Sequence, residues 1–314
     1  MAPNMLTKAE ALHYITSSLR LALNPAEQDV PSLSKLHKIC QAFIAEVPYS
    51  TLAIINTPMK QRRVPTLEEI KQQGLTKQGG MCYEMNVFLH WLLLAMGYEV
   101  HLLMARSFSV DYTHPLNTVR LDGKYYMVDC GPFPCMTEHL ICLDFAGDES
   151  PVILQSIWEV QLRRRLIDGV PGFAGYFRWT PNSSFPLGRH HTLPLDKDGW
   201  ALFFEYAFVF RSLEQIQQMS VAIQSSYQDV TVSPVLNRIF CCRYPKGRLQ
   251  LVRNTTLWQE NEPRIRSIKD TKSKAELVET LVEQFGDVLD RGLIEGAVEY
   301  YVTVAKLPED FVLH

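Results

Sequence analysis

Three residue types that act together in nucleophilic chemistry occur in order along the chain: Cys82, His114 and Asp129. A thiol is a strong nucleophile only as the thiolate, and a histidine that a carboxylate orients can take its proton. Cys82 lies in the stretch 79–86, which reads GGMCYEMN, directly before an apolar run at 87–96. A helix in this run would place the thiol at a positive helix N-terminus, and the two glycines let the backbone turn tightly.

Cys82 alone also fits a small buried apolar residue, so its partners decide the interpretation. The turn Asp122-Gly123 separates two strand-like runs and is a strong signal for a hairpin. A loop of these two residues alone places Leu116 opposite Asp129. His114 then shares a face with Asp129 as its diagonal neighbour, roughly 7–8 Å away at the backbone. A bulge at Pro115 would shift this register.

Other histidines compete as partners of Cys82. His101 lies on the preceding strand, where no carboxylate falls in an equally clear register. His90 lies inside the predicted helix and is interpreted as structural, and the pair at 190–191 is interpreted as a surface pair. His114 with Asp129 is therefore the favoured partnership.

The remaining cysteines predict neither a disulfide framework nor a metal site. The chain has seven cysteines, an odd number without framework spacing, which favours a reducing cytoplasm. Cys130, Cys135 and Cys142 lie near His139, but no CxxC pair is present, and structural zinc usually needs two such pairs. We therefore expect a cytoplasmic protein without metal ligands.

Length and charge restrict the class of protein. The chain has 314 residues, a formal charge of −3 and a pI of about 6.3, and two or three packed units are expected at this length. The short basic runs at 60–63 and 163–165 do not make the basic face of a nucleic-acid-binding protein and are interpreted as solvated surface. No apolar run reaches the roughly 20 residues of a membrane span, and the first residues do not predict a signal peptide. We expect neither nucleic acid nor membrane as a partner.

The order of the elements predicts an α+β protein. Helical spacing of apolar residues prevails before Gly97, including 33–47 and a capped helix at 66–70. From Tyr98 onward alternation is typical of strands, with turns at 122–123, 198–199 and 244–247. A helix over 213–224 would join the β regions, and one more amphipathic helix runs from Leu277 to Phe285 near the end. This order argues against a doubly wound sheet.

These stretches resemble the arylamine N-acetyltransferase family. The family hallmark Arg-Gly-Gly-x-Cys-x-Glu-x-Asn corresponds to residues 78–86, with Gln78 in place of the arginine. The family's Thr-His and Val-Asp-x-Gly correspond to Thr113-His114 and to 128–131. Its early helix, Pro-Phe turn, late hairpin and late helix correspond to 31–37, 47–49, 246–249 and the stretch ending near 285–286, so the resemblance covers most of the chain.

The resemblance implies a three-part fold with a cysteine-proteinase-like core. An N-terminal helical bundle, a central antiparallel β-barrel and a C-terminal α/β lid would follow one another. We expect the bundle with Cys82 at 1–97, the barrel with His114 and Asp129 at 98–210, a helical connection at 211–231, and the lid at 232–314. The tail after residue 286 has no implied role.

The resemblance also implies ping-pong chemistry at a Cys-His-Asp triad. An acyl-coenzyme A, with acetyl-coenzyme A as the default, would acylate Cys82, and an arylamine, hydrazine or similar amine would then take the acyl group. His114 would share a proton with Cys82 and later deprotonate the amine, while Asp129 orients His114. No metal or prosthetic group is implied, and the oligomeric state is open. Contacts with the substrates are expected from Thr113, Gly131 and Phe133.

Because the sequence departs from the family pattern, the reaction catalysed at this site stays open. The paired arginine and glutamate of the family are Gln78 and Ser50 here, a joint loss that can be nearly neutral. The family's Gly-Phe-Gly, which lines the acceptor and pantetheine site, reads Gly131-Pro132-Phe133. A biosynthetic acyltransferase or amide-forming cyclase on the same fold is therefore an alternative. A papain- or transglutaminase-like cysteine hydrolase and a non-catalytic binding protein are further alternatives.

Overall fold

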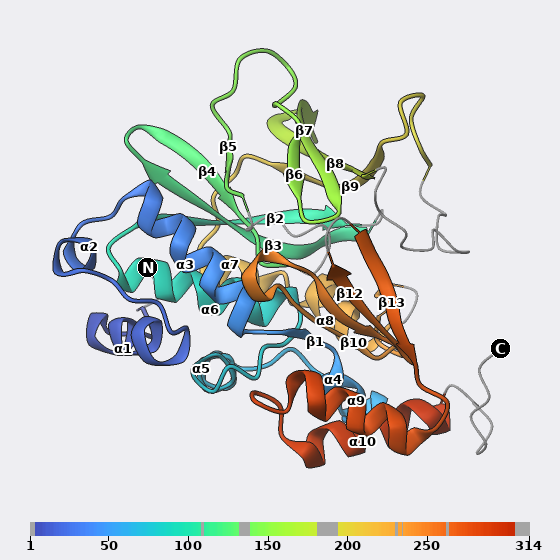
Figure 1. Ribbon diagram of the computed structural model, residues 1–314. Helices are drawn as coiled ribbons and strands as arrows, with labels where there is room; N and C mark the ends of the chain where they lie inside the picture. The colour runs from blue at the N-terminus through green and yellow to red at the C-terminus, as the bar shows by residue number, and fades with distance from the viewer. Residues whose placement is uncertain are drawn as a thin grey trace.

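The computed structural model describes residues 4–107, 110–131, 139–180, 194–229, 232–233, 235–261 and 264–304. It has the predicted α+β class: helices prevail up to α6, strands follow, and two helices end the described chain (Figure 1). The strands form two antiparallel sheets, one of eight strands and one of five. Within the described ranges, no helix is both long and apolar enough to cross a membrane.

The N-terminal region is helical because capping residues precede amphipathic stretches. Thr66 caps α5 through reciprocal hydrogen bonds with Glu69, and Ser32 caps α3, which ends at Glu46 ahead of Pro48. Both predicted helices are confirmed. The elements of this region are α1 (Lys8–His13), η1 (Tyr14–Ser18), α2 (Pro25–Asp29), α3 (Leu33–Glu46), α4 (Leu52–Ile55), η2 (Met59–Gln61), α5 (Leu67–Leu75) and α6 (Cys82–Ala95).

Helix α6 is buried on nearly all sides. Most of its side chains lie in the core, among them Phe88 and Trp91. The helix contacts α5 as well as strands β2 and β3 of the larger sheet. It ends where Gly97 adopts a φ of +84°, as the sequence predicts. Because the core encloses α6, packing fixes the place of its first residue, Cys82.

The larger sheet forms a nearly closed barrel with the strand order β5-β4-β3-β2-β9-β8-β7-β6. Asp122 and Gly123 have φ values of +51° and +78°, the left-handed pair that a two-residue hairpin turn needs. Leu121 pairs with Lys124, so the predicted register is confirmed. The strands are β2 (Glu99–Ser107), β3 (Val110–Leu121), β4 (Lys124–Val128), β5 (Ile141–Cys142), β6 (Ile153–Gln155), β7 (Trp158–Ile167), β8 (Val170–Trp179) and β9 (Ala201–Ala207).

The smaller sheet has the order β1-β10-β11-β12-β13, and its first strand comes from the N-terminal region. Tyr49 pairs with Cys242 and Ser50 with Cys241, which joins the two ends of the chain. The turn predicted at 244–247 is confirmed between β10 and β11, with η3 (Pro245–Gly247) in the loop. The strands are β1 (Tyr49–Ser50), β10 (Phe240–Arg243), β11 (Gln250–Arg253), β12 (Thr256–Asn261) and β13 (Arg264–Asp270).

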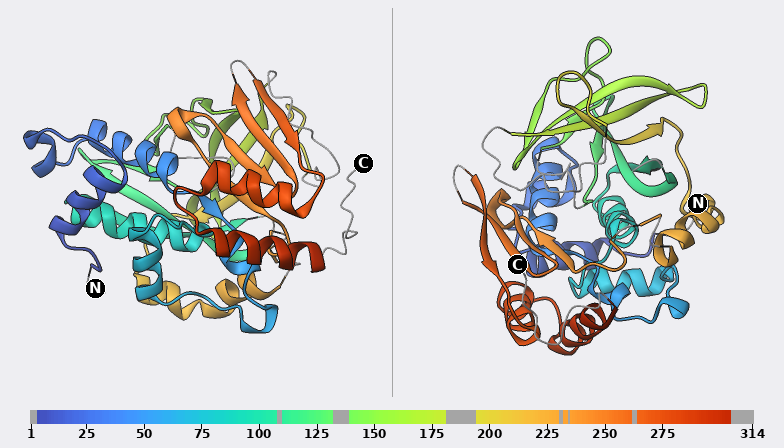
Figure 2. Two further views of the ribbon diagram at one scale, coloured as in Figure 1. Left: turned by 60° about the horizontal axis from the view of Figure 1, so that its bottom comes forward. Right: turned by 90° about the vertical axis from the view of Figure 1, so that its right-hand side faces the viewer.

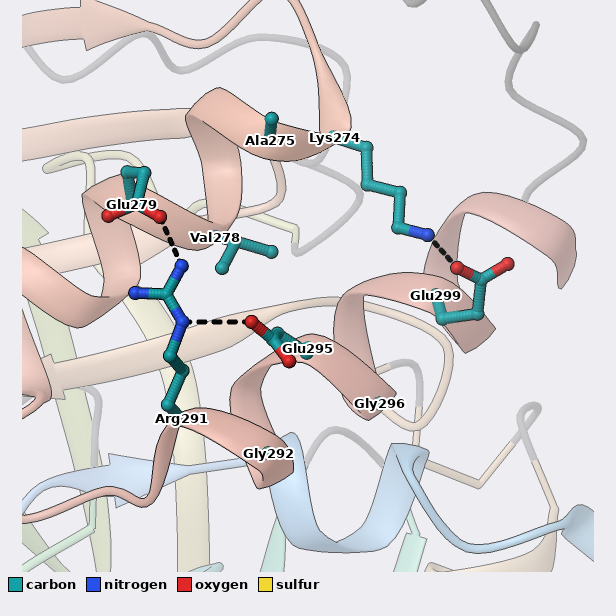
Figure 3. Close-up of a pocket in the computed structure, with 9 residues that line it drawn as sticks. All are labelled: Lys274, Ala275, Val278, Glu279, Arg291, Gly292, Glu295, Gly296 and Glu299. Carbon is teal, nitrogen blue, oxygen red and sulfur yellow. Dashed lines mark hydrogen bonds and ion pairs between the residues drawn. The ribbon is translucent and has the colours of Figure 1, made fainter.

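Helices α9 (Lys274–Phe285) and α10 (Arg291–Val304) pack beside the smaller sheet (Figure 2). Apolar side chains of that sheet, of both helices and of α4 form one buried cluster. Figure 3 shows a pocket between the two helices, where Arg291 contacts Glu279 and Glu295, and Lys274 contacts Glu299. Helix α9 confirms the amphipathic helix predicted up to Phe285, whereas α10 lies in the tail for which the sequence predicts no role.

The predicted connecting helix is divided in two, and the turn predicted at 198–199 is present. The connecting helix predicted at 213–224 is two helices, α7 (Leu213–Gln218) and α8 (Ser220–Gln228), which meet at Met219. The turn at 198–199 is present, since Asp196 N donates to Trp200 O over 2.9 Å, although part of its first strand lies outside the described residues. The boundaries expected at 97, 210 and 231 stay a prediction.

Candidate active site

Cys82 is the first residue of α6, and Met81 separates it from the glycine pair Gly79-Gly80. Gly79 and Gly80 turn the chain with φ values of +70° and +151°. A Cβ on Gly79 would lie 1.8 Å from the carbonyl oxygen of Pro48, so only glycine fits this position. The cap residue Met81 is extended and makes no side-chain cap. The helix dipole therefore favours negative charge beside Cys82.

The β3–β4 hairpin brings His114 and Asp129 together. His114 Nε2 lies 2.7 Å from Asp129 Oδ2, and the two side chains are only 7% and 2% exposed. His114 is part of β3, and Asp129 directly follows β4. Cys82 reaches His114 from α6 through a side-chain hydrogen bond. Because Asp129 takes Nε2, the Nδ1 atom of the ring is left for the sulfur.

The electrostatics of the pair favour its charged form. Burial acts to lower the pKa of His114, but Asp129 and Cys82 outweigh burial, and this pKa is raised well above its ordinary value of 6.5. Burial acts to raise the pKa of Asp129, but His114, Asn86 and Gly131 together hold it below its ordinary 3.8. An imidazolium in this place stabilises a neighbouring thiolate.

Asn86 completes the surroundings of Asp129, and sequence reasoning missed this role. Asn86 Nδ2 donates to Asp129 Oδ1 over 2.9 Å, and Asn86 Oδ1 accepts from Cys130 N over 3.2 Å. Gly131 N also donates to Asp129 Oδ1, over 2.9 Å. Asn86 follows Cys82 by four residues, which places both on one face of the helix. That spacing is the signal from which the role could be predicted.

Two of the three expected substrate contacts lie in the described part of the chain. Gly131 supports Asp129, and a Cβ on it would lie 3.0 Å from Cε1 of His114. Thr113 precedes His114 on β3 and is half-buried. Phe133 lies outside the described residues. Contact of these residues with a substrate stays a prediction.

Ser50 and Gln78, which replace the family's ion pair, leave no buried charge at their positions. Ser50 is buried, and its Oγ accepts from Leu52 N over 3.2 Å at the start of α4. The Ser50 side chain also bonds to the buried thiol of Cys241. Gln78 is half-buried, and its backbone N–H donates to Gln73 O over 2.9 Å. Neither position therefore holds a charge that needs a partner, and the nearly neutral effect of the joint replacement stays a prediction.

A hydrogen bond of Glu84 connects the first turn of α6 with α8. Tyr227 donates its hydroxyl to Glu84 Oε2 over 2.7 Å, and both side chains are buried. Burial raises the pKa of Glu84, against the opposite effect of the Tyr227 hydrogen bond. A negative charge on Glu84 is therefore disfavoured two residues from Cys82.

The competing histidines have other partners. His101 Nε2 lies 3.2 Å from Glu99 Oε1, and its ring stacks on Phe210 with centroids 4.0 Å apart. His90 Nδ1 lies 3.0 Å from Asn117 Oδ1. Burial lowers the pKa of His90 to about 4, so this ring is neutral near pH 7.

The described cysteines are free thiols. In the described part of the chain, no group of three or more His, Cys, Asp or Glu is placed to hold a metal ion. Cys135 and the histidine pair at 190–191 lie outside that part. The cytoplasmic location expected from the cysteine count stays a prediction.

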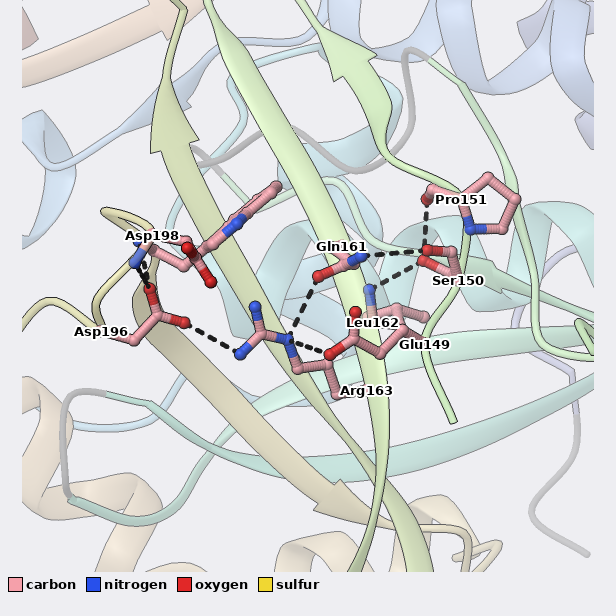
Figure 4. A network of polar contacts seen from close by, with 9 residues as sticks. Glu149, Ser150, Pro151, Gln161, Leu162, Arg163, Asp196 and Asp198 are labelled. Atoms are coloured by element: carbon pink, nitrogen blue, oxygen red, sulfur yellow. Dashed lines mark hydrogen bonds and ion pairs between the residues drawn. The ribbon is translucent and has the colours of Figure 1, made fainter. Parts of the chain in front are cut away.

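The basic run 163–165 is partly engaged in the barrel. Figure 4 shows Arg163 between two carboxylates, with Nη1 3.0 Å from Asp196 Oδ2 and Nε 3.3 Å from Glu149 Oε1. Its guanidinium also lies over the ring of Tyr176, 4.2 Å from the centroid. The Arg163 side chain is 19% exposed. Arg164 and Arg165 are exposed, as expected of a solvated run, whereas strand pairing brings acidic and aromatic neighbours to Arg163.

The fold is that of solved arylamine N-acetyltransferases. The enzyme from Salmonella typhimurium has a TM-score of 0.71 at 16% identity, with 94% of this chain and 99% of that chain covered. The enzyme from Mycobacterium abscessus has a TM-score of 0.70 at 17% identity, with 95% of each chain covered. At this identity the likeness defines the fold.

Sequence comparison defines the family. A family model described as N-acetyltransferase matches residues 32–294, so the chain belongs to the arylamine N-acetyltransferase family. Arylamine N-acetyltransferase 2 of Mus musculus is 25% identical over 276 residues, which cover 82% of this chain and 85% of that protein. Proansamycin X synthase of Amycolatopsis mediterranei is 32% identical over 125 residues. That match covers 36% of this chain and 45% of the synthase.

Proposed function

We propose that the chain is an acyl-coenzyme A-dependent N-acyltransferase in which Cys82, His114 and Asp129 are the catalytic residues. The observation that carries the proposal is the contact of Cys82 with the buried His114–Asp129 pair. In this pair His114 Nε2 lies 2.7 Å from Asp129 Oδ2. Membership of the family supports an arylamine or hydrazine as the acceptor. The donor is acetyl-coenzyme A or a related acyl thioester, supported by a relative from Mycobacterium marinum whose structure is a complex with CoA.

In the first half-reaction, the Cys82 thiolate attacks the carbonyl carbon of the acyl-coenzyme A thioester. The bond between that carbon and the sulfur of coenzyme A breaks, the coenzyme A thiol leaves with a proton from His114, and an acyl-Cys82 thioester remains. The raised pKa of His114 supports this step, because an imidazolium is the form that can give the proton.

In the second half-reaction, neutral His114 takes a proton from the amine while the nitrogen attacks the acyl carbon. The bond from that carbon to the Cys82 sulfur breaks, an amide leaves, and thiolate and imidazolium are restored. Asp129 stabilises the imidazolium in both steps. These steps need neither a metal nor a prosthetic group. Substrate contacts are assigned to Thr113, Gly131 and Phe133.

A biosynthetic acyltransferase or amide-forming cyclase is the second candidate. Ser50 and Gln78 depart from the family's ion pair, and the synthase from Amycolatopsis mediterranei is among the matched relatives. Both candidates use an acyl-Cys82 intermediate, so they differ in the acyl donor and in the amine. A donor that carries its own amine would favour the cyclase.

Intact-protein mass spectrometry after mixing with a panel of acyl-coenzyme A donors tests the proposal. We expect a mass gain equal to one acyl group, which a later addition of arylamine removes. Cys82→Ala should show no gain, while Cys142→Ala, which changes another partly exposed thiol, should behave as the wild type. Acylation that persists in Cys82→Ala would refute the proposal. Peptidase activity without acylation would instead favour a cysteine hydrolase.

A further inference from the structure

Besides the contacts of Asp129, a second set of polar contacts links α6 to β3. Asn117 Nδ2 donates to the backbone oxygen of Asn86 over 2.9 Å, and Asn117 Oδ1 lies 3.0 Å from His90 Nδ1. Asn86 and Asn117 are fully buried, and His90 is half-buried. The catalytic steps above use neither Asn117 nor His90.

The hydrogen bonds of Asn117 have one consistent assignment. Its amide nitrogen donates to a carbonyl oxygen, so its own oxygen faces His90. An amide oxygen only accepts, hence His90 carries a proton on Nδ1 and donates it. The bond is then formed by a neutral ring near pH 7, since the pKa of His90 is about 4.

Asn117 thereby bridges one turn of α6, because Asn86 and His90 are four positions apart. Asn86 holds Asp129 with its side chain, and Cys82 lies one turn further toward the helix N-terminus. A rotation or slide of α6 against β3 would break both bonds of Asn117 and leave buried polar atoms without partners, which is costly. The same movement would displace Cys82 from the hairpin.

Stability alone does not require a carboxamide at position 117. Apolar side chains of similar size pack between a helix and a sheet without the cost of burying polar atoms. A hydrogen bond adds direction, since it is satisfied in only a narrow range of positions. The buried amide of Asn117 therefore selects one placement of α6 on β3.

We propose that Asn117 and His90 are positioning residues that hold α6 in register with the β3–β4 hairpin, so that Cys82 stays aligned with His114 and Asp129. The kinetic part of this inference rests on the proposed acyl transfer. The alignment of the thiol with the imidazole does not, because alkylation of Cys82 reports it without any acyl donor.

The test compares variants of the contact with a matched control. Asn117→Leu and His90→Leu remove the bond, and His90→Asn keeps a side-chain donor at the position of Nδ1. Thr118→Val is the control, because Thr118 is the buried neighbour of Asn117 and its hydroxyl has no partner within the described ranges. Two rates are measured: acylation of Cys82 by acetyl-coenzyme A, and alkylation of Cys82 by iodoacetamide from pH 5 to 9, both followed by mass spectrometry.

Asn117→Leu and His90→Leu should slow both reactions roughly ten- to hundredfold, since small displacements of reacting groups cost that much. The slower alkylation should be seen across the whole range from pH 5 to 9. Its recovery in the conservative His90 variant is a result that a general loss of stability would not give. His90→Asn and Thr118→Val should react at close to the wild-type rate. If Asn117→Leu does not fold, the two His90 variants decide.

The outcomes separate the inference from the proposed function. Equal rates for Asn117→Leu and Thr118→Val, or for His90→Leu and His90→Asn, would overturn the positioning role. If no donor acylates the wild type but alkylation separates the variants as expected, the proposed function fails and the positioning role stands. If acylation proceeds in the wild type and no variant differs, the positioning role alone fails.

Discussion

At the level of single residues, Asp129 is surrounded by donors. His114 Nε2, Asn86 Nδ2 and Gly131 N all point hydrogens at its two oxygens. An asparagine at 129 must turn its NH₂ group toward one of them. The side chain can keep its oxygen on Asn86 and Gly131 only by presenting NH₂ to His114. The ring must then accept at Nε2, which places its proton on Nδ1, where it can no longer take one from Cys82.

We therefore expect Asp129→Asn to lower the rate of Cys82 acylation by about four orders of magnitude, as a wrong histidine tautomer does in related triads. Rapid-mix mass spectrometry of the acyl-enzyme measures this rate. Asn86→Asp is a useful companion variant. It places a second carboxylate beside Asp129, and this like charge should raise the pKa of the Asp129 carboxyl. A wild-type rate for Asp129→Asn would show that Asp129 does not orient His114.

The His114–Asp129 pair should also make stability depend on pH. The pKa of His114 is raised, so its contribution to the free energy of unfolding is complete below pH 6.5 and is lost as pH rises through the raised pKa. The pKa of Asp129 is lowered, so its contribution is present above pH 3.8 and is lost as pH falls through the lowered pKa. The pair therefore stabilises the protein most between these two pH values.

Urea unfolding of the wild type and of Asp129→Asn at pH 5.5 and 8.5 checks this sign. The difference in the free energy of unfolding between the two proteins should be larger at pH 5.5. The increase is up to about 1.4 kcal/mol for each pH unit between the ordinary and the raised pKa of His114. Other titrating groups cancel in the difference. A difference that grows toward pH 8.5 would contradict the raised pKa of His114.

At the level of elements, the β3–β4 hairpin is the part of the fold whose residue pairing the sequence predicts in most detail. A two-residue turn fixes the pairing of every following residue, so counting from Asp122-Gly123 correctly placed Asp129 beside His114. No bulge at Pro115 shifts this pairing. A register shift does occur between Ala105 and Ser107, on the β2 side of β3.

Replacement of Gly123 should test how far the site depends on this turn. Gly123 has a φ of +78°, so Gly123→Val should cost roughly 1–2 kcal/mol of unfolding free energy and slow acylation by loosening the register. Asp122→Asn is the matched control, because asparagine also tolerates the left-handed conformation. Urea titrations and acylation rates measure both effects. Equal stability of the two variants would show that the core, and not the turn, sets the register.

Other elements could not be predicted, for physical reasons. Strand β1 has only two residues, so it carries no periodic signal, and its partner β10 lies far along the chain. The break at Met219 leaves apolar residues at helical spacing on both sides, Ile216 and Ile223 among them. The role of Asn117 depends on a contact between a strand and a helix, which a local pattern does not contain.

At the level of the whole molecule, two apolar clusters share the N-terminal region. The larger cluster includes α6 and the barrel, and the smaller includes α4, the five-stranded sheet and the two last helices. Residues 49–55 thus connect the region of Cys82 to the C-terminal part through β1 and α4. The family match ends at residue 294, inside α10. The contacts of this helix with the rest of the protein therefore define its contribution.

Helix α10 should be an integral part of the folded protein. Ile294 is fully buried in the cluster that also contains Leu52 and Ile55 of α4. Ile294→Ala should lower the free energy of unfolding by about 2–5 kcal/mol, because it removes apolar contacts and leaves a cavity. Arg291→Ala is the matched control: its contacts with Glu279 and Glu295 join exposed side chains and should contribute little. Urea unfolding followed by circular dichroism measures both. If Ile294→Ala were as stable as Arg291→Ala, α10 would be an appendage, and the C-terminal core would end with α9.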